Sequence, residues 1–98
     1  MLKRGMRPSH PGLGLPDEFE ALGWTIAEAA KQLGVSRSQL HRICRGDSAI
    51  SPTLAYRLEV GVGGVASHWL AMQATYDLWQ IRLAPPTNIK AREAKLAV

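Results

Sequence analysis

Apolar residues recur at helical spacing in two consecutive segments of the chain, residues 26–33 and residues 37–45. Within each segment they fall three or four positions apart, which places them on one face of a helix. Gly34 lies between the segments, and glycine readily adopts the left-handed conformation that ends a helix and turns the chain. Ser36 then stands where a helix cap is needed. The pattern predicts a helix-turn-helix, and its alternative is an ordinary helical hairpin.

The ends of these two segments carry further signals. Thr25 precedes the first helix and Glu28 follows three residues later, which is the spacing of a reciprocal capping box. Leu40 and Ile43 fall on the inner face of the second helix. The polar side chains of that helix are therefore expected on its outer face.

The expected outer face is basic. Residues 29–46 contain four Lys or Arg, one histidine and no acid. A solvated helix face normally mixes charges of both signs, whereas an unmixed basic face suits a polyanion. A helix fits the major groove of B-form DNA, and its first turn reaches the bases, where arginine can donate two hydrogen bonds to guanine. In the alternative, the hairpin binds protein only and its basic face is incidental. The residues predicted to touch double-stranded DNA are Arg37, Ser38, His41 and Arg42, with Lys31 and Arg45 suited to phosphate contacts.

Three more helices are expected around this pair. One begins at Pro16 and ends at Gly23, and another begins at Pro52 and ends near the glycine-rich run at residues 61–64. The longest is expected from a cap at Ser67 to Leu83, because two prolines follow. Residues 1–14 have no helical periodicity and are interpreted as an N-terminal arm. We expect the domain to span residues 15–84, with a flexible tail at residues 85–98.

The longest predicted helix is apolar over more than one face. A surface helix needs a single apolar stripe about 100° wide. Here one apolar flank runs from Trp69 to Leu83, and a second is formed by Leu70, Ala74, Leu78 and Ile81. One flank can cover the core, and the other is expected to pair with the same helix of a second subunit. The alternative is that both flanks belong to the core. The residues of the predicted dimer seam, spaced alternately three and four apart, are Trp69, Met72, Tyr76, Trp79 and Leu83.

Composition supports an intracellular binding protein without catalytic chemistry. The 98 residues allow one domain, and the net charge of +4 favours an acidic partner. The single cysteine, Cys44, fits a reducing compartment and is interpreted as core filler. No segment resembles a signal peptide or a membrane span. The three histidines lie far apart without a cysteine at metal-ligand spacing, so we expect no enzyme, cofactor or metal site.

Three segments together resemble the HigA-type antitoxins of bacterial toxin–antitoxin modules, within the λ-repressor-like helix-turn-helix class. Residues 7–12, Arg-Pro-Ser-His-Pro-Gly, resemble the R-P-x-H-P-G opening of that family. The turn Leu33-Gly34-Val35 and the following Ile50-Ser51-Pro52 stand at the spacing of the family. Residues 69–78 resemble its W-L-x-x-Q-x-x-Y-D-L signature.

This resemblance implies an all-α fold, a five-helix λ-repressor-like domain with flexible termini. It also implies a homodimer formed through the C-terminal region, which represses its own operon at an inverted-repeat operator. The expected second partner is a small basic toxin of the HigB type that cleaves messenger RNA, and the expected location is the bacterial cytoplasm, at the nucleoid. A repressor without a toxin is the alternative. Carried onto this chain, the base-reading positions of such repressors are Ser36, Arg37, Ser38, His41 and Arg42.

The sequence departs from the family pattern in two places. Residues 13–16, Leu-Gly-Leu-Pro, interrupt what is usually a long first helix. Residues 63–67 form a link into the last helix that is richer in glycine than is usual. Both departures are expected to affect local stability and toxin contact more than DNA binding.

Overall fold

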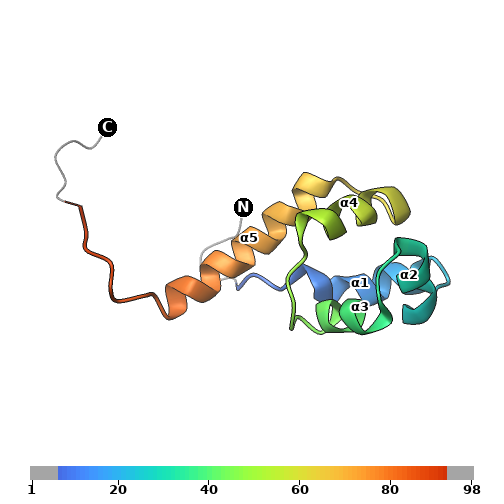
Figure 1. The fold of residues 1–98 in the computed structure, drawn as a ribbon, viewed down its shortest axis with the longest axis horizontal. Coiled ribbons are helices and arrows are strands. Elements are labelled where there is room, and N and C mark those ends of the chain that lie inside the picture. Colours follow the sequence, from blue (N-terminus) through green and yellow to red (C-terminus); the bar gives the residue numbers. More distant parts are fainter. Residues whose placement is uncertain (1–6, 93–98) are drawn as a thin grey trace.

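The computed structural model describes residues 7–92, and the regular secondary structure within that range is entirely helical. A short 3-10 helix is followed by five α-helices, the last of which projects beyond the other four (Figure 1). The expected five-helix, all-α fold is confirmed. The first six residues of the expected arm and the last six of the expected tail lie outside the described residues. The helices are η1 (Pro11–Gly14), α1 (Leu15–Ala21), α2 (Ile26–Leu33), α3 (Arg37–Cys44), α4 (Pro52–Gly61) and α5 (Ala66–Leu83).

One hydrophobic core holds the first four α-helices together. Each contributes at least one side chain that is almost completely buried, such as Phe19 from α1 and Leu58 from α4. Complete burial of a side chain of this size stabilises the fold by about 1.5–3 kcal/mol. Helix α5 adds only its first turns, because Trp69 and Leu70 pack against the core while Leu78 and Leu83 are 47% and 63% exposed. Most of the C-terminal half of α5 therefore has no cover within its own subunit.

Side-chain caps define where several helices begin. The predicted capping box of α2 is present: Glu28 Oε1 accepts from Thr25 N at 2.8 Å, and Thr25 Oγ1 accepts from Glu28 N at 3.1 Å. Hydrogen bonding of the Glu28 carboxylate to Thr25, first to its backbone N–H and then to its side chain, lowers the pKa of Glu28. Helix α5 differs from the expectation, because it begins at Ala66 and Ser67 is not its cap. The carboxylate of Glu59 takes the place of that cap by accepting from Ala66 N at 2.7 Å.

The N-terminal segment is packed where the sequence predicted an arm. His10, Pro11 and Gly12 are buried, and η1 contacts both α3 and α5. His10 Nδ1 accepts a hydrogen bond from Gly12 N at 2.9 Å, and its ring meets Tyr76 edge-on with the ring centroids 5.1 Å apart. Helical periodicity could not reveal this segment, since it is held by contacts with residues more than 30 positions away.

Gly12 is required by the close approach of η1 to the end of α3. A Cβ atom at this position would overlap the backbone carbonyl of Ile43 and crowd His10 Nδ1. By contrast, a Cβ at Gly14 would meet nothing, and Gly14 has ordinary right-handed helical angles. The N-terminal motif therefore packs directly against the last turn of α3.

We predict that Gly12→Ala destabilises the protein, whereas Gly14→Ala does not. The added methyl group at residue 12 must push η1 away from the Ile43 carbonyl, and such overpacking costs about 1–3 kcal/mol. The same change at residue 14 should be neutral or stabilise by about 0.4–1 kcal/mol, because alanine restricts the unfolded chain. Urea unfolding followed by circular dichroism measures both. Equal free energies of unfolding for the two variants would contradict the packing described for η1.

Candidate nucleic-acid interface

The turn between α2 and α3 positions the candidate interface. Gly34 has φ 72° and ψ 31°, the left-handed conformation predicted for it. Val35 N donates to the Ala30 carbonyl at 3.0 Å, and the guanidinium of Arg57 donates to the Leu33 carbonyl at 3.0 Å. These bonds satisfy backbone groups that the end of α2 would otherwise leave unpaired. The buried, small Ala29 and Ala30 let α3 pack closely on α2, which confirms the predicted helix-turn-helix.

Helix α3 has one buried face and one exposed face. Leu40, Ile43 and Cys44 are buried, as predicted. Ser36 caps the helix by accepting from Gln39 N at 3.0 Å. Every residue predicted to touch DNA is exposed, six of them on α3 or at its ends and Lys31 on α2: Lys31, Ser36, Arg37, Ser38, His41, Arg42 and Arg45.

Sequence reasoning missed two features of this face. Gln39 is exposed in the first turn of α3, where base-reading residues are expected, and glutamine can pair with adenine through two hydrogen bonds. A glutamine three residues after the cap was the signal available. The second feature is Asp47, whose Oδ2 lies 3.4 Å from Arg45 Nε at the edge of the face. Both of these side chains are more than half exposed, at 65% and 55%, so the pair is weak and leaves Arg45 available to a phosphate.

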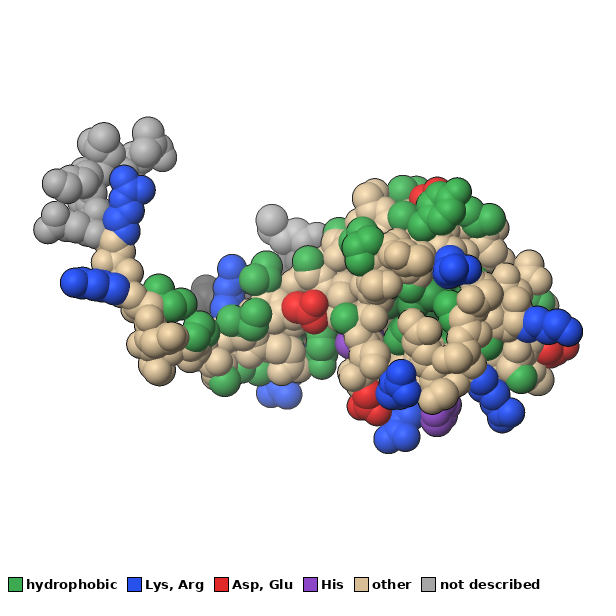
Figure 2. Space-filling view, viewed as in Figure 1, with side chains coloured by type: hydrophobic (Ala, Val, Ile, Leu, Met, Phe, Trp, Pro, Cys, Tyr) green, Lys and Arg blue, Asp and Glu red, His purple; other side chains and the backbone are tan. Residues whose placement is uncertain are grey.

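Lys and Arg side chains gather along the edge of the molecule where α3 lies. Figure 2 shows them at the lower right, below the four packed helices, with a histidine among them. Arg42 Nη1 donates to Ser38 Oγ at 3.1 Å, which holds this arginine along the helix surface. The arrangement offers a polyanion a row of cations on a rigid helix.

Gln73 ties α5 to the loop that follows α3. It is buried, its Oε1 accepts from Ile50 N at 2.9 Å and its Nε2 donates to Asp77 Oδ1 at 3.0 Å. Because an unpaired buried amide is costly, the bond to Ile50 favours one position of α5 relative to this loop, while the bond to Asp77, which lies within α5, pairs the other end of the amide. No sequence pattern predicted this contact, since its two partners are 23 positions apart.

The five residues of the predicted dimer seam do not share one environment. Trp69 packs against the core of its own subunit, and its Nε1 donates to the Gly63 carbonyl at 3.4 Å. Tyr76 lies between His10 and Trp79 and is half-buried. Met72 and Trp79 are also half-buried, and Leu83 is largely exposed. The N-terminal part of the seam is thus partly covered by its own chain.

Among residues 7–92, no three His, Cys, Asp or Glu side chains are grouped so that they could hold a metal ion. Cys44 is buried, and this burial raises the pKa of its thiol. None of the described helices is both long and apolar enough to cross a membrane.

Comparison with known proteins found a matching family model, related sequences and a related solved structure. Residues 18–66 match the helix-turn-helix family model. The chain is 40% identical to virulence-associated protein A′ of Dichelobacter nodosus, across 81% of this chain and 70% of that protein. It is 32% identical to antitoxin HigA-1 of Vibrio cholerae, across 84% and 78% of the two chains. A Pseudomonas aeruginosa protein, crystallised in complex with its 18-base-pair operator DNA, superposes with a TM-score of 0.74 at 35% identity, across 84% of this chain and 89% of that one.

We predict that Ser36→Ala weakens α3 while Ser38→Ala leaves the fold intact. The first change removes the acceptor for Gln39 N, and loss of such a cap costs about 1 kcal/mol. The second removes only an exposed contact to Arg42. The free energy of unfolding in urea separates the two. A cost at residue 38 as large as that at residue 36 would show that the capping geometry is not what stabilises this helix.

Proposed function

Because this chain belongs to the helix-turn-helix family of the HigA-type antitoxins, we propose that it represses its own toxin–antitoxin operon through α3 and neutralises a HigB-type toxin that cleaves messenger RNA. The observation that carries the proposal is the rigidly positioned, exposed basic face of α3. The relative crystallised with operator DNA supports the same use of this fold. The family identifies the chain as a DNA-binding regulatory protein rather than an enzyme. Its site of action is then the bacterial cytoplasm, at the nucleoid.

The position of each side chain suggests its role on DNA. With α3 in the major groove, its first turn faces base edges, where Arg37 and Gln39 suit guanine and adenine respectively. Ser38 lies in the same first turn, and His41 and Arg42 lie further along the exposed face; all three contact bases or adjacent phosphates. The hydroxyl of Ser36 accepts from its own helix and can still donate to a phosphate. Lys31 on α2 and Arg45 after α3 flank the helix and suit the phosphate backbone.

The proposed repressor is a two-fold dimer built on α5. Leu78, Ile81 and Leu83 are 47%, 51% and 63% exposed on the part of α5 that projects from the core (Figure 1). A second copy packed on the side of α5 that carries Leu83 would remove part of this apolar surface from water. Two-fold symmetry would place the two α3 helices about 34 Å apart, matching successive major grooves on one side of the duplex. The operator is then an inverted repeat.

We predict that Arg37→Ala together with Arg42→Ala weakens binding to the DNA upstream of the gene. Each side chain is exposed, so the fold survives, and each lost base contact costs about 1–3 kcal/mol. Fluorescence anisotropy with a labelled duplex measures the loss. The matched control is Arg82→Ala together with Lys90→Ala, which removes the same two charges away from α3 and should leave affinity nearly unchanged. Equal affinity of the double variant and the wild type would show that α3 does not read the operator.

Loss of a phosphate contact is expected to affect DNA binding differently from loss of a base contact. Lys31→Ala and Arg45→Ala should weaken binding to specific and random duplexes alike, and each should reduce the slope of log affinity against log salt by about one. The anisotropy titration repeated at several salt concentrations measures these slopes. A change in sequence preference without a change in slope would instead place these two residues at the bases.

We also predict that Leu83→Glu converts the dimer into a monomer. The new carboxylate would have to be buried in the α5 interface without a partner, which is costly. Ile89→Glu is the control, because Ile89 is 70% exposed but lies beyond the end of α5. Sedimentation at micromolar concentration should give a dimer for the wild type and the control. A monomeric wild type that still binds its operator tightly would contradict the dimer.

A further inference from the structure

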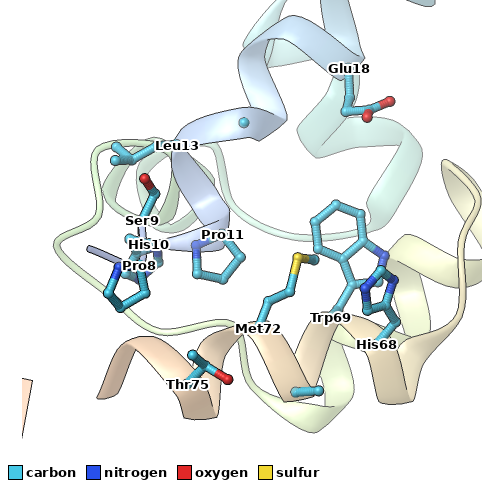
Figure 3. A pocket seen from close by; sticks show the side chains of 12 residues that line it. Pro8, Ser9, His10, Pro11, Leu13, Glu18, His68, Trp69, Met72 and Thr75 are labelled. Carbon is cyan, nitrogen blue, oxygen red and sulfur yellow. The ribbon is translucent and has the colours of Figure 1, made fainter. Parts of the chain in front are cut away.

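A groove runs along the N-terminal half of α5. Its volume is about 840 Å³, and η1 with the first turn of α1 forms its opposite wall. Figure 3 shows Pro11 and Leu13 on that wall, with Trp69 and Met72 rising from α5. Thr75 lies at one end of the groove. The residues 7–12 motif, which the DNA interface does not use, is thus part of a largely apolar concave surface.

The same face of α5 becomes convex and apolar beyond the groove. Trp79 lies seven residues after Met72, and Leu83 lies four residues further, so all three share one side of the helix. Tyr76 also belongs to this side and is half-buried. The helix therefore carries a hollow on its first half and a projecting apolar side chain, Leu83, on its second half.

We infer that, in the dimer proposed above, the two α5 helices pair antiparallel and Leu83 of each copy enters the groove of the other. An antiparallel pair with its two-fold axis between residues 77 and 78 places Met72 of one copy opposite Leu83 of the second. The same axis places Tyr76 opposite Trp79. A two-fold interface must be self-complementary. Because the groove beside Met72 and the projecting Leu83 lie equally far from the axis, each copy can place its Leu83 in the groove of the other, and the same contact forms twice.

The chemistry of the groove favours a second copy over a partner of another kind. No seam residue from Met72 to Leu83 is charged, which fits the uncharged centre of a homodimer interface. A strongly basic partner would be better matched by acids, but Glu18 is the one carboxylate among the groove-lining residues. A parallel pair would place Leu83 against Leu83 and leave both grooves open to water. The antiparallel pair closes them and gives the N-terminal motif a role as the wall of the interface.

Site-specific cross-linking tests this orientation in the full chain. The variants Met72→Cys and Leu83→Cys are prepared separately and treated, singly and mixed, with a short bis-maleimide. Equivalent residues 72, or equivalent residues 83, would be about 16 Å apart in the antiparallel pair, since each is five to six residues from the axis at about 1.5 Å per residue. A linker well below that length joins only unlike positions. Native Cys44 is buried and burial raises the pKa of its thiol, so it is less accessible to the reagent than the introduced cysteines, and the wild type treated in the same way is the control.

The mixture should yield a cross-linked heterodimer, identified by mass, and neither variant alone should link to itself. Self-linking of the Leu83→Cys variant would establish a parallel pair and overturn the inference. Absence of cross-linking in the mixture, while sedimentation still shows a dimer, would also overturn it and leave the proposed repressor dimer standing. A wild-type monomer at the same concentration would reject the dimer itself, and the orientation with it.

Discussion

Burial of Leu40 and Ile43 decides which side of α3 faces solvent. Once these two side chains are in the core, the helix can present only its polar face, and that face carries cations without acids of its own. The start of α3 is held by the left-handed turn at Gly34, and its end is held by the close approach of Gly12 to the Ile43 carbonyl. The basic surface is therefore a consequence of core packing, and its rigidity is what a DNA-reading helix requires.

The features that the sequence predicted are local ones. The capping box at Thr25, the glycine turn and the inward residues of α3 all depend on neighbours within about four positions, where periodicity and cap chemistry operate. The buried roles of His10 and Gln73 depend on contacts across more than 20 positions, and no local pattern encodes them. Ser67 shows that a local pattern can also mislead. Its residue type suits a helix cap, but the carboxylate of Glu59 accepts from the first backbone N–H of α5 instead.

Two long-range contacts connect α3 and the loop that follows it to the rest of the molecule. Gln73 binds the backbone of Ile50 just before α4, and the N-terminal motif contacts both α3 and α5. These contacts favour one angle between α3 and α5. In a dimer built on α5 that angle sets the separation of the two recognition helices, and with it the spacing of the half-sites. Residues 7–12 and 69–78, which resemble the antitoxin family, thus include the side chains that hold α3 and α5 together.

The outer face of α3 is the surface proposed to read the operator. Amide chemical shifts of the isotope-labelled protein, recorded during titration with the duplex upstream of its gene, test this residue by residue. We expect the largest changes between Ser36 and Arg42, with the amides of α1 nearly unaffected. Changes concentrated on α1 or on the seam of α5, with the amides of α3 unmoved, would contradict it.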